Sequence, residues 1–328
     1  MSFNNTQLQP EIVKDILSGL ANLDGDYIAD AMLPGIPTNF ERGSIPTLAA
    51  GSHFGLLGET GRRSPGGEVS VGPGVGYGTV DYLIEVFDRA ERLPKEIQRR
   101  SQVPIPLLTQ YLAMAVNFLR VGREQRLAAV LTNAATVWAN GAGGVAAGGF
   151  WDGAGDPVAD ISTAAETIAG GHPDTIAMGK ETWEGLRRNA LLLAALKTTQ
   201  DNALMNESSF ASAVASHFGV GANRIFIGRA QALNSADPDD VNVATALADI
   251  HGDYFWIGQV GGLAAPMANG DLLMQPSAVA RVIESDFEDE FDSDWLITHK
   301  SWQVQTGIAE QILPVTPGLA ALITNTHT

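Results

Sequence analysis

Histidines and carboxylates are the side chains here that could carry out chemistry, and their spacing argues against a conventional active site. The chain has no cysteine among its 328 residues, which excludes disulfides, thiolate metal sites and cysteine nucleophiles. No two histidines stand four residues apart, so a helical two-histidine metal site is absent. No Gly-x-Ser-x-Gly nucleophile elbow occurs either. The six scattered histidines are His53, His172, His217, His251, His299 and His327.

Two glycine-rich motifs resemble phosphate-binding loops without meeting their requirements. A dinucleotide fingerprint must follow a strand and open a helix, whereas Gly72–Gly78 leads into the β-rich stretch Thr79–Phe87. Gly58–Ser64 lacks the lysine and the spacing of a P-loop. We therefore predict no catalytic, cofactor-binding or metal-binding residue.

An acidic run spans Glu284–Asp294 and could bind a hard cation through carboxylate oxygens. It lacks the central glycine and the spacing of an EF-hand, so a solvated face or a contact between subunits is the preferred interpretation. A hydrolase with paired carboxylates stays open at this point, because the fold would set the pair.

A long amphipathic helix is predicted from about Ile105 to about Ala134, directly after two prolines that suit a first turn. Apolar residues recur at helical spacing and form its stripe: Leu108, Leu112, Ala115, Leu119, Leu127, Val130, Leu131 and Ala134. We expect the charged residues to face away from this stripe: Arg120, Arg123, Glu124 and Arg126.

The composition limits the class of protein. The net charge of -17 argues against a nucleic-acid-binding domain, because such a surface repels phosphates. No run of 18 uncharged apolar residues predicts a membrane span, and the N-terminus does not resemble a signal peptide. The length predicts two domains or one large elaborated domain.

The first part of the chain looks poor in self-contained structure. Residues 1–50 are expected to form an arm with a short helix at 10–17 and extended pieces separated by prolines. Residues 51–78 contain ten glycines, which predicts an extended two-stranded excursion, with a disordered linker as the alternative. Arms and excursions of this kind make sense when they lie across a neighbouring subunit.

The rest of the chain predicts a mixed α/β arrangement after residue 150. A strand at 79–87 precedes a charged connection at 88–100, and a flexible joint is expected at 140–149. Helices are predicted at 160–169, with Asp160 as N-cap, at 180–188 and at 208–218. Strands are predicted at 173–178, 224–228, 254–257, 295–304 and 320–323.

Read in order, several short motifs resemble the major capsid proteins of tailed bacteriophages with the HK97-like fold. The resemblance covers about 77–325 and rests on the order of motifs rather than on a catalytic signature. The matching stretches are Tyr77–Phe87, Arg92–Pro94, Arg123–Leu131, Trp151 with Asp156–Ile161, Pro173–Gly179 with Trp183, Leu186, Arg187 and Asn189, and Phe218–Val220 with Ile225–Ala230.

The resemblance implies an α+β HK97-like capsid fold. Its parts would be an N-terminal arm (1–50), an extended E-loop hairpin (51–80), a peripheral domain with a long spine helix (81–149), an axial α/β domain (150–284) and a return to the peripheral domain (285–328). The implied function is a non-enzymatic shell subunit that self-assembles in hexamers and pentamers around the phage genome. Alternatives are an encapsulin-like nanocompartment shell and, from another class, a soluble oligomeric enzyme.

The implied partners are other copies of the chain, a separate scaffolding protein and portal, a decoration protein and non-specifically contacted DNA, without a membrane. The implied location is the virion, after assembly in the host cytoplasm. Contacts between subunits are predicted at Arg62, Arg63, Glu68, Arg120, Arg123, Arg126, Glu288 and Asp289. Because residues 51–78 contain no lysine, we expect a shell without isopeptide crosslinks, and the net charge predicts an acidic or neutral lining.

Overall fold

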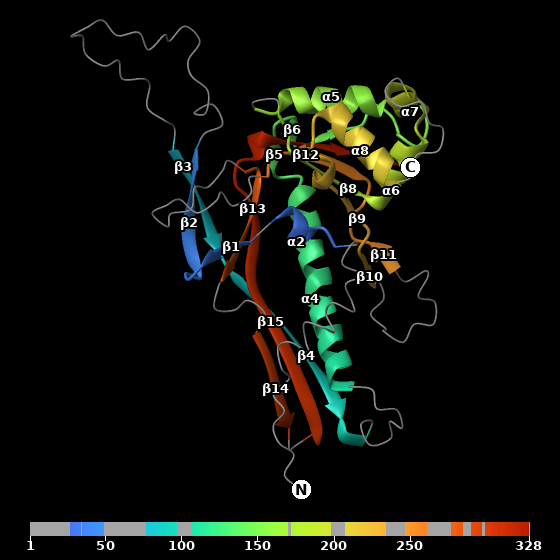
Figure 1. The fold of residues 1–328 in the computed structure, drawn as a ribbon. Helices are drawn as coiled ribbons and strands as arrows, with labels where there is room; N and C mark the ends of the chain where they lie inside the picture. The colour runs from blue at the N-terminus through green and yellow to red at the C-terminus, as the bar shows by residue number, and fades with distance from the viewer. Residues whose placement is uncertain are drawn as a thin grey trace, which may run out of the picture.

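A computed structural model describes residues 27–33, 35–48, 77–96, 107–169, 172–197, 207–233, 247–260, 277–284, 290–296 and 299–327. The molecule is elongated: an α/β unit lies at one end, and a long helix and long strands extend away from it (Figure 1). A two-stranded ribbon projects to one side.

The α/β unit is built on a five-stranded mixed sheet in the order β7-β16-β12-β8-β9. Its strands are β7 (Val145–Ala146), β16 (Ala320–Thr324), β12 (Tyr254–Gly258), β8 (Thr175–Gly179) and β9 (Ile225–Gly228). Central β12 pairs antiparallel with both β16 and β8, while the outer pairings are parallel. Successive side chains of a strand point to opposite faces of the sheet. Because β8, β12 and β16 are buried on both faces, both faces of the sheet must be covered.

Four helices cover one face of this sheet: α5 (Pro157–Thr167), α6 (Lys180–Arg188), α7 (Ala190–Lys197) and α8 (Glu207–Phe218). Phe255 and Ile257 of β12 pack against them together with Trp151 and Trp183. Smaller elements lie beside the unit, namely the 3₁₀ helix η3 (Ala222–Arg224) and the hairpin β10 (Gln231–Leu233) and β11 (Leu247–Asp249).

The opposite face of the sheet carries Tyr254 and Trp256 and is covered by the C-terminal part of a long helix, α4 (Leu107–Leu131). A single-turn helix near the N-terminus, α2 (Ala29–Met32), is inserted at the same place, and Met32 is fully buried. Ile28, Ala29, Met32 and Leu33 are therefore part of the core that joins the two ends of the molecule.

The extended half is a second sheet with the order β1-β13-β15-β14, and β4 also pairs with β15. The long strand β15 accommodates three partners, because β14 pairs with its first part, β13 with its last part, and β4 with Ser301–Glu310. Its strands are β1 (Gly35–Thr38), β13 (Val279–Glu284), β15 (Ser301–Pro314), β14 (Glu290–Leu296) and β4 (Glu85–Pro94). Helix α4 runs along one face of this sheet (Figure 1). The ladder between β15 and β4 joins ten residue pairs, from Ser301↔Pro94 to Glu310↔Glu85.

The projecting ribbon consists of β2 (Arg42–Leu48) and β3 (Tyr77–Leu83), which pair antiparallel up to Leu48↔Tyr77. Residues 49–76 lie outside the described residues, and so do the predicted helix at 10–17 and most of the glycine-rich excursion. The remaining elements are β5 (Val137–Trp138), β6 (Gly141–Ala142) and the 3₁₀ helix η5 (Pro317–Leu319).

Several predictions about individual elements are wrong. The strand predicted at 79–87 is two strands, because β3 ends at Leu83 on β2 and β4 begins at Glu85 on β15. The charged connection at 88–100 is strand up to Pro94, because β15 supplies hydrogen-bond partners along that length. The joint at 140–149 is ordered by the β5–β6 hairpin and by β7 on the sheet edge. The N-cap of α5 is Asp156, which accepts hydrogen bonds from the amides of Val158 and Ala159.

A further error concerns the predicted strand 295–304, which is two strands. The chain reverses so that Leu296 of β14 lies opposite Ser301 of β15, and Lys300 adopts a positive φ of 46°. The long helix and the helices at 180–188 and 208–218 are confirmed, as are the strands at 173–178, 224–228, 254–257 and 320–323, with ends shifted by up to a few residues.

Candidate functional site

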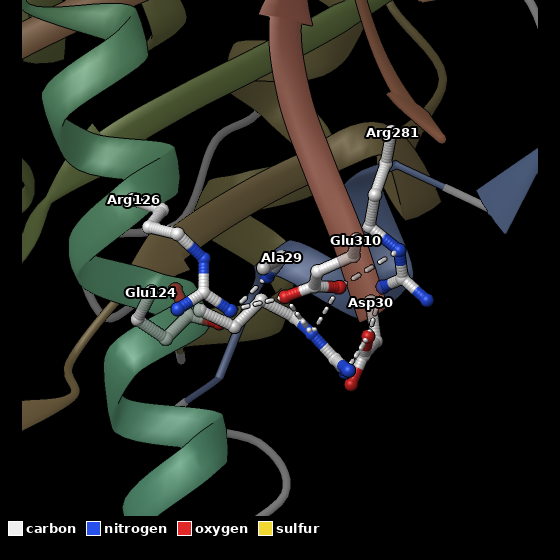
Figure 2. Close-up of polar contacts among 7 residues, drawn as sticks. Ala29, Asp30, Glu124, Arg126, Arg281 and Glu310 are labelled. Atoms are coloured by element: carbon white, nitrogen blue, oxygen red, sulfur yellow. Dashed lines mark hydrogen bonds and ion pairs between the residues drawn. The ribbon is translucent and has the colours of Figure 1, made fainter. Parts of the chain in front are cut away.

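A buried group of charged side chains lies where α2, α4, β13 and β15 meet (Figure 2). At its centre is Glu310 of β15, whose side chain is fully buried. Helix α4 brings two arginines to this carboxylate, because Arg123 and Arg126 stand one turn apart. The Nε atom of Arg123 donates to both carboxylate oxygens, at 3.1 and 3.0 Å, and Arg126 bonds to one of them.

Strand β13 contributes a third arginine to the group. Arg281 is 6% exposed, and its Nε atom lies 3.6 Å from Oε2 of Glu310. Its Nη1 atom pairs with Asp30 of α2, which Arg123 also contacts. The ion-pair network therefore comprises Asp30, Arg123, Arg126, Arg281 and Glu310, with three guanidinium groups against two carboxylates.

The network shifts the pKa values of two of its members, Asp30 and Arg123. Burial raises the pKa of Asp30, but Arg123 and Arg281 outweigh burial, so the pKa lies below the usual value for an aspartate. Burial lowers the pKa of Arg123, but Asp30 and Glu310 together raise it by more, so the pKa lies above the usual value for an arginine. Asp30 and Arg123 are thus held in their charged forms by their partners.

A second buried chain of polar groups runs from α4 into the α/β unit. Glu124 is 1% exposed, and its Oε1 atom accepts a hydrogen bond of 2.7 Å from the backbone amide of Ala29. Its Oε2 atom lies 2.7 Å from Nε2 of His251, and Nδ1 of His251 lies 2.6 Å from the hydroxyl of Tyr254. Buried polar groups need such partners, because an unsatisfied one costs about 1–3 kcal/mol.

The chemistry of this chain assigns its protons. A carboxylate only accepts, so Nε2 of His251 donates to Glu124. Burial and the charge of Glu124 raise the pKa of Tyr254, so the phenol keeps its proton and donates to Nδ1. Both ring nitrogens of His251 then have hydrogen-bond partners. Gly228 makes room for this ring, because an added Cβ would lie 2.1 Å from Cδ2 of His251.

Two arginines also stack on aromatic rings between α4 and β4. The guanidinium carbon of Arg126 lies 3.7 Å from the centroid of Phe87, and that of Arg89 lies 4.3 Å from the centroid of Phe118. Such cation–π contacts add to the attachment of the helix to the sheet.

The arrangement binds distant segments of the chain together through buried side chains. His251 and Glu310 are fully buried, and Glu124 nearly so. Within the described ranges, no group of three histidine, aspartate or glutamate side chains could hold a metal ion. No described helix is long and apolar enough to cross a membrane.

The predicted site residues have different outcomes. Arg123 and Arg126 pair with carboxylates of their own chain, and Arg120 is half-buried on α4. Contacts of these three arginines with a second subunit stay a prediction. The other predicted residues lie outside the residues whose side chains are described: Arg62, Arg63, Glu68, Glu288 and Asp289.

The expectation that all charged residues of the long helix face away from its buried side is wrong. Glu124 is buried and Arg123 nearly so, because Asp30, Glu310 and His251 provide partners from distant segments. One signal for Glu310 was present, since this residue interrupts an apolar run that includes Ile308, Ala309, Ile312 and Leu313. Asp30 and Arg281 carried the same signal, because they interrupt the apolar runs Ile28–Leu33 and Ala278–Ile283, whereas His251 did not.

No family model and no curated protein matches the sequence, whereas solved structures do. The fold is similar to that of a phage-related protein from Bordetella bronchiseptica RB50, with a TM-score of 0.65 and 18% identity over 95% of this chain and 97% of that chain. It is similar to the capsid structure of the cyanophage P-SCSP1u, with a TM-score of 0.52 and 13% identity over 90% and 86% of the two chains.

A third similar structure is a virus-like particle from Pyrococcus furiosus, with a TM-score of 0.50 and 10% identity over 95% of this chain and 98% of that chain. At these identities the likeness is one of fold. It confirms the predicted mixed α+β fold, shared with a phage capsid structure over most of the chain.

Proposed function

We propose that the chain is a major capsid protein, a structural subunit that assembles into the icosahedral head shell around a phage genome. The observation that carries this proposal is the likeness to the cyanophage capsid structure over 90% of this chain, supported by the nearly end-to-end match to the phage-related protein. The buried polar groups are used to join segments of the chain, which suits a non-enzymatic role.

The elements map onto the parts of an HK97-like subunit in this proposal. The β2–β3 ribbon would be the base of the E-loop, whose distal part is residues 49–76. Helix α4 would be the spine helix of a peripheral domain that includes β4, β13, β14 and β15, and the α/β unit would be the axial domain. The ribbon begins at Arg42, so residues 42–48 go with the E-loop rather than with the arm.

The partners follow from the same proposal. Copies of the chain would form hexamers and pentamers, with a separate scaffolding protein and a portal taking part in assembly in the host cytoplasm. A decoration protein on the outer surface and non-specific contacts with packaged DNA complete the set, and the virion is the final location.

Negative-stain electron microscopy of the expressed chain, alone and with the scaffolding protein from the same genome, tests the proposal. Closed shells or shell fragments of uniform curvature are the expected result. A monodisperse small oligomer under both conditions, combined with turnover of a substrate, would instead support the soluble enzyme.

A nanocompartment shell is the second candidate, and the likeness to the virus-like particle favours it. Genes for a terminase and a portal beside the coding sequence would support the phage head. A neighbouring gene for a peroxidase or a ferritin-like protein, whose product co-purifies inside the shells, would support the nanocompartment.

The predicted contacts between subunits have their own tests. Arg62→Ala combined with Arg63→Ala should lower the yield of shells while the circular dichroism of the subunit stays unchanged. A normal yield would argue against intersubunit ion pairs at these residues. The shells should also run as single subunits on boiled denaturing gels, because residues 51–78 offer no lysine for an isopeptide bond.

A further inference from the structure

The solvent-facing side of α4 is unusual because no charged residue is among its described exposed side chains. A surface helix normally buries an apolar stripe and exposes charges. Here Arg123 and Glu124 point into the protein, whereas Met114 and Phe118 are 61% and 52% exposed. Among the α4 side chains that the structure describes, the exposed ones are all neutral: Gln110, Met114, Asn117, Phe118, Gln125 and Ala129. We call the part of this side around Asn117, with Met114 and Phe118, the outer patch.

The N-terminal end of the described chain starts at the outer patch. The hydroxyl of Tyr27 donates a hydrogen bond of 2.6 Å to Oδ1 of Asn117. Immediately after it, Ile28, Ala29 and Met32 are buried in the core, and Asp30 joins the ion-pair network. The described chain thus begins at Tyr27 beside Asn117, and Met114 and Phe118 lie within one turn of Asn117.

The sequence before Tyr27 contains a segment that fits an apolar partner surface. Ile12, Val13, Ile16 and Leu17 fall on one side of a helical projection, and polar residues occupy the other: Glu11, Lys14, Asp15 and Ser18. Pro10 suits the first turn, and Gly19 suits the end. A helix of about nine residues is unstable alone in water, so it needs a surface on which to bury its apolar side.

We propose that residues 10–18 form an amphipathic helix that docks on the outer patch of its own subunit. The intervening residues 19–26 span up to about 26 Å when extended, which is more than the docking requires. A tether of this length holds the segment at an effective concentration of about millimolar, so the same subunit competes well against a second copy. Apolar side chains of the segment would cover Met114 and the part of Phe118 that Arg89 leaves exposed to water.

The absence of cysteine from the chain makes crosslinking a direct test. Met114→Cys would be combined in turn with Ile16→Cys and with Leu17→Cys in full-length, unassembled subunits at low concentration. A short bismaleimide reagent should give intrachain links in both, identified by mass spectrometry. The matched controls combine Met114→Cys with Lys14→Cys or with Ser18→Cys, which place the thiol on the polar side of the segment.

The expected result is crosslinking several-fold faster for the apolar-side pairs than for the polar-side pairs. Equal rates would overturn the proposal, because an undocked tether does not distinguish the two sides. Links found only between isotopically labelled and unlabelled subunits would also overturn it, by assigning the outer patch to a second copy. Neither readout depends on shell formation, so this proposal and the proposed capsid function can fail separately.

Limited proteolysis gives an independent measurement. Lys14 is the only trypsin site within residues 1–26, so release of the peptide 1–14 reports on exposure of the segment. Met114→Glu should accelerate this release several-fold, because a charge on the outer patch opposes an apolar partner. Ala129→Glu places the same charge about 22 Å further along the helix and should leave the rate unchanged. Equal rates in the two variants and the unmodified chain would contradict docking.

Discussion

The two halves of the molecule are held together by different kinds of buried side chain. The α/β unit has an apolar core in which Trp151 stacks edge-on against Phe255 at 5.5 Å, and Trp183 against Phe210 at 5.1 Å. The extended half has instead a buried carboxylate, Glu310, surrounded by arginines where α4 crosses the sheet. Apolar burial is non-directional, whereas ion pairs require particular positions of both partners.

This difference predicts where each half tolerates change. An apolar core accepts substitutions of similar volume, at a cost that follows the volume removed. A buried ion pair contributes little net stability, yet removal of one partner leaves a charge without compensation and is expensive. The network should therefore act as a positional constraint on α2, α4, β13 and β15, which becomes evident only when it is broken.

The largest effect is expected when the central carboxylate is removed. Glu310→Ala leaves Arg123, Arg126 and Arg281 close together without their shared partner, which should lower the free energy of unfolding by about 3–5 kcal/mol. Urea unfolding of the unassembled subunit measures this. The control is Glu184→Ala, which removes an exposed pair with Arg188 and should cost under about 0.5 kcal/mol. Equal costs for the two variants would show that the network imposes no constraint.

A smaller effect is expected from the main polar residue inside the α/β unit. Asn189 is buried, its Nδ2 atom donates to the carbonyls of Trp151 and Gly155, and its Oδ1 atom accepts from the amides of Leu191 and Leu192. Asn189→Ala leaves these groups unsatisfied at the start of α7 and should cost about 2 kcal/mol in urea unfolding. Asn189→Asp keeps the acceptor but loses the donor, so an intermediate loss is expected. A cost near zero for both would contradict the assigned role.

The apolar core gives the next smaller effect and the clearest contrast with the network. Ile257→Val removes one buried methylene from the face covered by the helices and should cost about 1 kcal/mol. Because no charge is involved, this cost should be the same at low and at high salt. The penalty of Glu310→Ala should instead decrease at high salt, because salt reduces repulsion among the partly exposed arginines. Parallel salt responses would remove the distinction between the halves.

Sequence patterns predicted elements whose signals are local. The helix at 180–188 and the helix ending before Gly219 follow from period and end signals, and Gly219 has the expected positive φ of 73°. The hairpin at Lys300 was missed because apolar and polar residues alternate on both sides of the turn, so the pattern gives no sign of the reversal.

The buried network was beyond local patterns for a physical reason. A charged residue in a helix is expected at the surface unless a partner is known, and the partners here are far apart in sequence. Glu124 and His251 are 127 residues apart, and Arg123 and Glu310 are 187 residues apart. The positions of Arg123 and Arg126 on one side of the long helix could be predicted, but their burial depends on the tertiary structure.

The smallest effect tests the edge of the network and depends on pH. Arginines 123 and 281 outweigh burial and hold the pKa of Asp30 below its usual value, so the folded chain binds fewer protons at this carboxyl than the unfolded chain does. The stabilisation is therefore present above about pH 4, the unfolded pKa, and is lost as the pH falls through the lower folded pKa. Because the Asp30 side chain is 48% exposed, its contribution should be under about 1 kcal/mol.

Asp30→Asn removes this titration while keeping the shape of the side chain. The urea midpoint of the variant should be below that of the unmodified chain near neutral pH, and the difference should narrow as the pH falls below about 4. Asp249→Asn is the matched control outside the network, and its difference from the unmodified chain at neutral pH should be smaller. If the difference in urea midpoint between Asp30→Asn and the unmodified chain instead stays constant down to about pH 3, Asp30 contributes shape rather than charge. The ion-pair network would then end at Glu310.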